Sequence, residues 1–429
     1  MSIYQKQRFE EVLPTRNSTD NNFSGQIIFD YQTGVNTEII DDESYLYIDV
    51  EITKNGIPWV DTDAEILLRG FSNAPFACLF TTADLMINNR VVSRVDEFPQ
   101  SYLIKRLAFN GNGEERIQSG NPVNIEDLTQ VGPSRALYSN TGDAVIFADS
   151  PSIWRRAKNA QQSGLYFSAN GRPTLAMKLS TLFDKKGIVP LPPASKMQWR
   201  FQVDPLYREL MVVTGEGLDD VGGVYTVAVK ELHMYLSVYE RVPITPDYSY
   251  RAEYVDLFST TQTLSATTTH RFHLSIPEGC NRLLCCLFDS SKTNVSTPTI
   301  FSSDSIANLT RFRLTYAGQT FPDPDYQFSA NLLDRDKKRA YEQFLRETQS
   351  LMSASGNSLS FGQWCACPMY VFRVVRPPGS RHTTVQVELD FSAAVAVGTT
   401  FYLGAMYDKE LTVQYNEMLQ PVTTTINEL

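Results

Sequence analysis

The chain has 429 residues, of which 42% are hydrophobic and 20% charged, and a formal net charge of −10. This composition is that of a globular protein and excludes wholesale disorder, while the length suits two domains of roughly 200 residues each. The acidic balance argues against a surface that neutralises nucleic-acid phosphates, so we predict no sequence-specific nucleic-acid binding.

Hydropathy and cysteine usage indicate where the protein is made. No apolar run approaches the ~20 residues needed to cross a bilayer, and the polar segment Met1–Arg16 lacks the apolar stretch of a secretory signal. Six cysteines in so long a chain do not form a disulfide framework. We therefore expect a protein that is made inside the cell, is not secreted, and keeps its cysteines as buried reduced thiols.

The chain begins with a polar segment followed by strand patterns. We predict a mobile N-terminal arm over residues 1–22, with a short helix around Gln5 to Val12. Strand signals begin at Phe23–Tyr31, and Tyr45–Ile52 alternates cleanly between apolar and polar residues. Alternation at period two indicates strands with one buried face.

The next part of the first half combines a hairpin, a helix and a long loop. Phe76–Val95 is largely extended, with a predicted turn at Asn88-Asn89, because asparagine tolerates left-handed backbone. Phe98 starts a short helix. The segment Gly111–Gly171 is polar and turn-rich, and a loop of this length is usually functional.

The stretch Met197–Glu240 closes the first half. Its two ends, Met197–Val203 and Leu232–Tyr239, alternate between apolar and polar residues, and the turn-rich segment Gly215–Gly223 lies between them. This pattern predicts two long antiparallel strands at the end of a β-sandwich. A Pro-rich linker at Pro243–Asp247 follows.

The second half repeats the order of the first. A turn at Ala317–Gln319 is placed like Asn88-Asn89, and a helix with Ser329 as candidate N-cap comes after it. The predicted strands are Arg271–Ile276, Leu283–Phe288, Phe312–Tyr316, Met369–Val375, Val385–Phe391, Thr400–Tyr407 and Leu411–Tyr415. We predict an arm over 1–22 and a duplicated β domain over 23–243 and 244–429.

Around eight short strands in each half, with a helix inserted between the fourth strand and the later ones, are typical of jelly rolls. The predicted fold class is therefore all-β: two tandem eight-stranded jelly rolls, a double jelly roll, with short inserted helices.

At this point the sequence resembles the double jelly-roll major capsid proteins, of the type found in polinton-like viruses, adintoviruses and virophages and related to those of large DNA viruses. The match rests on the order and spacing of segments from about residue 80 to 415. These segments are Leu182–Leu191 followed by Trp199–Val203, then Tyr235–Arg241, Arg313–Gln319, Met369–Arg373, Val385–Phe391 and Gly404–Tyr415.

The resemblance implies a structural role. Two rolls would form one subunit, and a homotrimer would be a pseudo-hexameric capsomer that tiles the icosahedral capsid of a DNA virus. The protein would lie in the virion, with penton and minor or cement capsid proteins as partners, and an internal membrane beneath the shell is left open. The loop Gly111–Gly171 would then contribute to subunit contacts or to the outer surface.

Candidate chemistry is sparse, and we predict no catalytic, cofactor-binding or metal site. His270 and His273 would point to opposite faces of a strand, and Cys285-Cys286 and Cys365-Ala366-Cys367 lack zinc-knuckle spacing. Asp323-Pro324-Asp325 suits a turn better than a calcium site, as do the acidic residues at Glu216, Asp219 and Asp220. The sequence has no phosphate-binding loop and no nucleophile elbow.

Two alternatives to the capsid subunit stay open. The first is a tandem β-sandwich carbohydrate-binding protein, lectin-like, which needs an exposed aromatic-lined groove. The second is an enzyme on a cupin-like fold, which needs a histidine-rich metal cluster. The four histidines, His233, His270, His273 and His382, are too dispersed to favour it.

Overall fold

The structure is a computed structural model of the whole chain. It describes residues 4–15, 23–54, 56–58, 69–71, 76–108, 174–187, 189–205, 212–214, 225–245, 248–289, 308–329, 334–349, 359–374 and 383–428. The predicted long loop Gly111–Gly171 and the predicted turn Gly215–Gly223 lie outside these residues.

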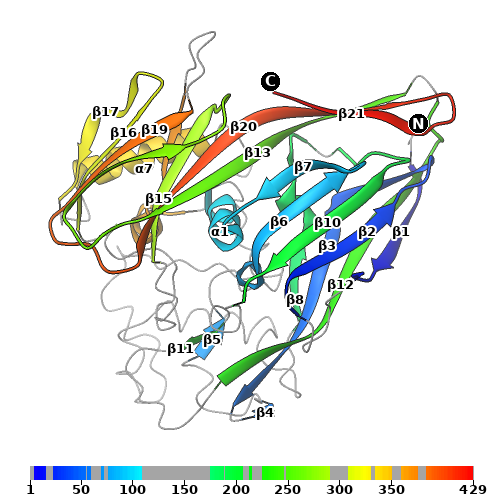
Figure 1. The fold of residues 1–429 in the computed structure, drawn as a ribbon, viewed down its shortest axis with the longest axis horizontal. Coiled ribbons are helices and arrows are strands. Elements are labelled where there is room, and N and C mark those ends of the chain that lie inside the picture. Colours follow the sequence, from blue (N-terminus) through cyan, green and yellow to red (C-terminus); the bar gives the residue numbers. More distant parts are fainter. Residues whose placement is uncertain are drawn as a thin grey trace.

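The first half forms two antiparallel sheets around a common core (Figure 1). One sheet has the order β1-β12-β3-β8 and the other the order β2-β10-β6-β7. The strands are β1 (Tyr4–Val12), β2 (Gln26–Gln32), β3 (Thr37–Lys54), β6 (Phe80–Ile87), β7 (Arg90–Val95), β8 (Thr174–Lys178), β10 (Lys196–Val203) and β12 (Tyr225–Arg241). Helix α1 (Phe98–Ala108) follows β7, and we call this unit the first roll.

The second half, the second roll, is built in the same way. Its sheets have the orders β13-β20-β15-β18 and β14-β19-β16-β17. The strands are β13 (Ser249–Thr263), β14 (Thr269–Ser275), β15 (Arg282–Asp289), β16 (Leu309–Tyr316), β17 (Gln319–Gln327), β18 (Tyr370–Arg373), β19 (Thr384–Phe391) and β20 (Thr399–Tyr415). Helices α7 (Arg335–Gln349) and α8 (Phe361–Ala366) lie between β17 and β18.

Short elements complete the described chain. They are the strands β4 (Ile57–Pro58), β5 (Arg69–Phe71), β9 (Asp184–Lys185), β11 (Val212–Thr214) and β21 (Pro421–Glu428), and the 3₁₀ turns η3 (Ala77–Leu79) and η6 (Leu179–Leu182). Strand β21 pairs with the end of β20.

Both rolls follow one strand order. Counted along each roll, strands 1, 8, 3 and 6 form one sheet and strands 2, 7, 4 and 5 the other. This is the order of a jelly roll, so the predicted double jelly roll is confirmed. The inserted helix follows the fifth strand of each roll, not the fourth, because the prediction missed the first strand of both rolls.

Alternation of burial explains why these segments are strands. In β10 the side chains of Met197, Trp199, Phe201 and Val203 are buried, while the residues between them are partly exposed. Strand β19 shows the same pattern. The two-residue turns at Asn88-Asn89 and Ala317-Gly318 have positive φ throughout, which fits the primed turns of tight hairpins.

Two predictions for the first roll are wrong. Residues 4–12 are neither helix nor mobile arm but strand β1, which pairs antiparallel with β12 along its length. Strands β10 and β12 do not pair with each other; they lie in opposite sheets. Alternation indicates a half-buried strand but carries no information about which sheet the strand enters.

Two further predictions need correction in the second roll. Thr400–Tyr407 and Leu411–Tyr415 are parts of a single strand, the 17-residue β20. Helix α7 begins at Arg335, well after Ser329, and the Asp334 carboxylate accepts a hydrogen bond from the Asp336 amide at its start. Asp334 therefore caps the helix in place of Ser329.

All six cysteines are buried free thiols, as predicted. Burial raises the pKa of Cys285 and Cys286 well above the ordinary thiol value. Because the thiolate is the reactive form, we predict that no cysteine of the native protein reacts with a thiol reagent, whereas all six react after unfolding. An aromatic-disulfide assay with and without denaturant measures this, and rapid labelling of the native chain would contradict it.

Candidate functional site

The most extensive feature of the described chain is the junction between the rolls. Strands β13 and β20 run past their own roll and lie over the first roll, so that β7 and α1 face the β13-β20 sheet (Figure 1). Strand β9, which follows β8 of the first roll, adds to this sheet by pairing with β13. The two rolls therefore share a sheet.

Side chains of the second roll bind the first roll directly across this junction. The Tyr254 hydroxyl donates a hydrogen bond to the Val92 carbonyl (3.0 Å), and the Ser259 hydroxyl donates one to the Asp96 carbonyl (2.8 Å). Tyr402 and Ser101, both fully buried, are hydrogen-bonded through their hydroxyls at 2.8 Å. Because buried polar groups need partners, these bonds fix the position of the second roll on the first.

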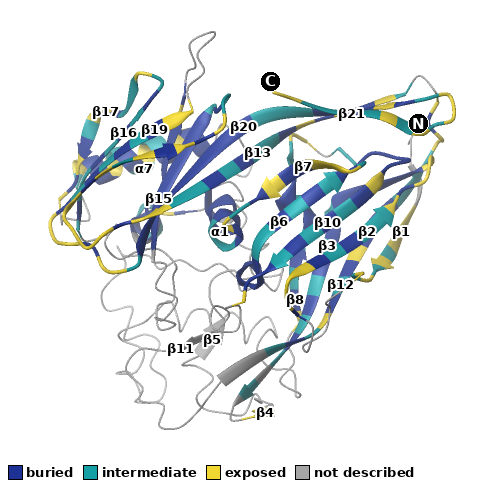
Figure 2. Cartoon of the chain, viewed as in Figure 1, coloured by how far each residue is buried: buried dark blue, intermediate teal, exposed yellow. Residues whose placement is uncertain are grey.

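Helix α1 is enclosed by this arrangement. It is buried on the sides that face both rolls, as the dark colour of the helix shows (Figure 2). Ser101 points to the second roll, while Phe98 and Tyr102 pack in the core of the first. The polar residues Ser101 and Lys105 of this helix are buried as well. Each has a partner: Ser101 is hydrogen-bonded to Tyr402, and the Lys105 ammonium lies 2.7 Å from the Asp184 carboxylate.

A buried ion pair lies beside the shared strand. The Lys185 ammonium of β9 contacts the Asp41 carboxylate of β3 at 2.5 Å, and both side chains are 2% exposed. Burial raises the pKa of Asp41 to about 6 although the lysine opposes this shift. The lysine also donates to the Val189 carbonyl. The stability of the fold therefore depends on both members of the pair, since either charge alone would be buried and uncompensated.

We predict that Lys185→Met lowers the free energy of unfolding by about 3–5 kcal/mol, because it leaves the Asp41 carboxylate without its counter-ion. The matched control is Lys186→Met, since the neighbouring lysine is 40% exposed and such pairs contribute about 0–1 kcal/mol. Urea unfolding of both variants measures the difference. Equal stability losses would contradict the role of the pair.

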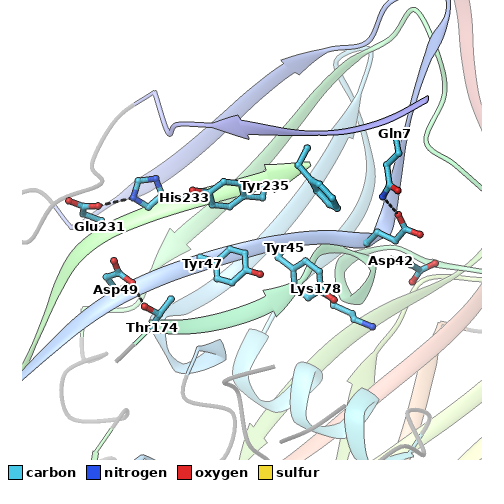
Figure 3. Close-up of a pocket in the computed structure, with 12 residues that line it drawn as sticks. Gln7, Asp42, Tyr45, Tyr47, Asp49, Thr174, Lys178, Glu231, His233 and Tyr235 are labelled. Carbon is cyan, nitrogen blue, oxygen red and sulfur yellow. Dashed lines mark hydrogen bonds and ion pairs between the residues drawn. The ribbon is translucent and has the colours of Figure 1, made fainter. Parts of the chain in front are cut away.

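The second feature is a hollow on the outer face of the β1-β12-β3-β8 sheet, with a volume of about 1030 Å³ (Figure 3). We call it the tyrosine hollow, because the rings of Tyr45, Tyr47 and Tyr235 lie side by side in it. Tyr47 and Tyr235 meet edge to face at 5.5 Å. The other lining residues are Gln7, Phe9, Asp42, Glu43, Asp49, Thr174, Lys178, Glu231 and His233.

The register of the strands makes the residues of the hollow neighbours. Tyr235 of β12 lies opposite Tyr45 of β3, and His233 opposite Tyr47. Strand β1 then supplies Glu11, whose carboxylate accepts a hydrogen bond from the Tyr235 hydroxyl at 3.1 Å. Four carboxylates and one lysine line the hollow, so its surface is acidic.

His233 is held between two carboxylates, one from β1 and one from β12. Its Nδ1 lies 2.7 Å from Glu11 and its Nε2 lies 2.9 Å from Glu231. Partial burial alone would lower the pKa of His233, but the hydrogen bonds with Glu231 and Glu11 outweigh it, and the pKa is raised above its ordinary value. The protonated imidazole is therefore the form that links β1 to β12.

A pH dependence follows from this. A histidine whose folded pKa is raised stabilises the fold below about pH 6.5, and that contribution is lost as the pH rises through the folded pKa. We predict an NMR titration of His233 with a pKa above about 6.5, and a lower pKa in the double variant Glu11→Gln, Glu231→Gln. An unchanged pKa in this variant would contradict the assignment.

The structure also places the residues that were weighed for chemistry. His270 is buried and His273 is exposed, so the two lie on opposite faces of β14 as predicted. Asp325 binds Arg311 at 2.8 Å. Among the described residues no group of three or more acidic, cysteine or histidine side chains could hold a metal ion. His382, Glu216, Asp219 and Asp220 lie outside those residues.

Comparison with solved structures identifies the fold. The chain aligns over 100% of its length with 89% of a chain in the cryo-EM structure of the Sputnik virophage (TM-score 0.65, 12% identity). It aligns over 100% with 91% of the mavirus major capsid protein (0.55, 12%), and over 99% with 99% of a chain in the PBCV-1 virus capsid (0.50, 10%). No family model and no curated protein matches the sequence.

These likenesses show the fold. The chain has the double jelly-roll fold of viral capsid proteins, as its sequence resemblance indicated. The strand orders found in the two rolls support the same fold independently. In the described part of the chain, no helix has the length and apolarity required to span a membrane.

Sequence reasoning missed the tyrosine hollow. The signal was present in the outward positions of two predicted strands, Tyr45 and Tyr47 in one and His233 and Tyr235 in the other. Outward positions of a strand are expected to be polar, so an aromatic pair there marks an unusual face. What could not be predicted was that the two pairs are neighbours.

Proposed function

We propose that this chain is the major capsid protein of an icosahedral DNA virus, a structural subunit that acts by self-assembly and not by turnover. The observation that supports this best is the junction: two rolls of identical strand order share a sheet and form one unit. The full-length likeness to capsid structures supports the same role.

The physical reason for two rolls is packing symmetry. A homotrimer of a chain with two similar domains presents six similar units, so threefold symmetry imitates sixfold packing in a shell. The junction supports such packing. Because the two rolls are fixed relative to each other, they lie at the same angle in every copy of the chain. We propose pseudo-hexameric trimers, formed inside the host cell, that tile the capsid of the virion.

Other partners belong to the same proposal. Vertices of an icosahedral shell have fivefold symmetry, so a separate penton protein is expected there, and minor or cement proteins would join the trimers. We also propose that the chain divides after residue 243, between the end of β12 at Arg241 and the start of β13 at Ser249. The compared structures favour this role over a carbohydrate-binding one, since they are capsids or capsid proteins.

We predict that the purified chain has a native mass of about three times its 48.4 kDa and appears in negative stain as particles of hexagonal outline, or as shells. The reason is that heterologous contacts between subunits close into a ring. Light scattering coupled to size exclusion measures the mass. A stable monomer over the whole accessible concentration range would contradict the proposal.

A further inference from the structure

Strand β21 is an edge strand with one free side. It pairs with the end of β20 from Lys409 to Tyr415, and no other described strand pairs with it. Figure 1 shows β21 on the upper border of the molecule, beyond β20 and β13. In the described chain, the outer backbone N–H and C=O groups of β21 are therefore open to pairing with a further strand.

Other edge strands of this protein are protected against such pairing. Strand β1 has four charged residues, and β17 has two prolines and two aspartates. Charges and prolines are the usual protection of a sheet edge. Strand β21 has the sequence Pro-Val-Thr-Thr-Thr-Ile-Asn-Glu, in which the proline and the single charge lie at opposite ends. Its centre consists of uncharged β-branched residues, which favour pairing with another strand.

Side-chain contacts hold β21 in place on the first roll. The Asn88 amide, in the turn between β6 and β7, donates a hydrogen bond to the Thr424 hydroxyl at 3.1 Å. Ile426 packs against the hydrophobic core. The strand is therefore a preformed edge, and a preformed edge loses less entropy on binding than a segment that first has to fold.

The sequence of β21 is nearly symmetric about Thr424. In an antiparallel pair of two copies of this strand centred on Thr424, that residue lies opposite itself. Thr423 then lies opposite Thr425, and Val422 lies opposite Ile426. Pairs of β-branched residues stabilise such a ladder, and no like charges face each other in it. A surface that is complementary to itself is what a twofold contact between identical chains requires.

We infer that β21 joins this chain to a second copy of itself, by antiparallel pairing of β21 with β21 across a twofold axis. A twofold contact relates two chains only and cannot close a ring of three. The two chains therefore belong to adjacent trimers, and the pairing makes one continuous sheet of their β20 and β21 strands. This inference rests on the proposed function and adds a contact through which the trimers join one another.

Charges introduced at two positions that face each other test this pairing in the full-length protein. Thr423→Lys with Thr425→Lys places like charges opposite each other twice, and we expect it to weaken the association between trimers about tenfold. Thr423→Lys with Thr425→Glu is the matched control, because the same two positions then carry opposite charges and the association is retained. Sedimentation velocity measures trimers and larger assemblies, and thermal unfolding verifies that both variants are folded.

The outcomes separate this inference from the proposed function. If the variant with two lysines associates as strongly as the wild type, or the variant with opposite charges as weakly as the one with two lysines, the inference is overturned and the proposed trimer stands. A wild-type chain that stays monomeric would overturn the proposed function itself.

Disulfide trapping provides a second measurement. In concentrated trimers of Thr424→Cys we expect oxidation to join two chains, since residues that lie opposite each other in an antiparallel pair have Cα atoms about 4.5–5.5 Å apart. Val422→Cys is the control: Val422 is 65% exposed but lies opposite Ile426, so its cysteine does not meet its own equivalent. The six native cysteines are buried and do not contribute. Chains that are not joined through Thr424→Cys, or are joined equally through Val422→Cys, would overturn the inference.

Discussion

The outer face of the β13-β20 sheet has to be covered, and the first roll covers it. This constraint organises the molecule. Tyr402 and Ser259 carry hydroxyl groups on that face. Burying a hydroxyl group costs free energy unless the group forms a hydrogen bond. Ser101 and the Asp96 carbonyl are those partners. The first roll therefore acts as part of the core of the second.

The two rolls are therefore not independent domains joined only by a linker. Strand β9 pairs with β13 of the second roll, and the buried Asp41–Lys185 pair holds β9 on β3 of the first roll, so the two rolls are connected at a second point. Buried ion pairs add little net stability compared with apolar residues, but they penalise arrangements that separate their members. The pair is suited to selecting one relative placement of the rolls, which is what a subunit of a regular shell requires.

Much of the fold could be predicted from the sequence because burial leaves a period-two signal. Strands such as β10 and β19, with one face in the core, alternate without interruption. Strand β1 was missed because it is an edge strand with charged residues on both faces, among them Arg8, Glu10 and Glu11. Polar edge strands protect a sheet from unwanted pairing, and the same property hides them from a hydrophobic pattern.

The second limit on the prediction was the pairing of strands that lie far apart in the sequence. The sequence pattern predicted β10 and β12 as neighbouring antiparallel strands, whereas in the jelly-roll order they belong to opposite sheets. The tyrosine hollow depends on the register of β12 with both β1 and β3, so its residues could be identified as outward-facing but not as neighbours. Features that arise from pairing across the chain become visible only once the partners of each strand are known.

A cryo-EM reconstruction of the purified full-length oligomer tests the account most directly. We expect three chains whose six rolls form one ring, in which the two rolls of every chain hold the same relative placement and the first roll covers Tyr402 and Ser259 of the second. A reconstruction in which the two rolls of a chain take up variable relative positions, or in which the outer face of the β13-β20 sheet points to solvent, would contradict this expectation.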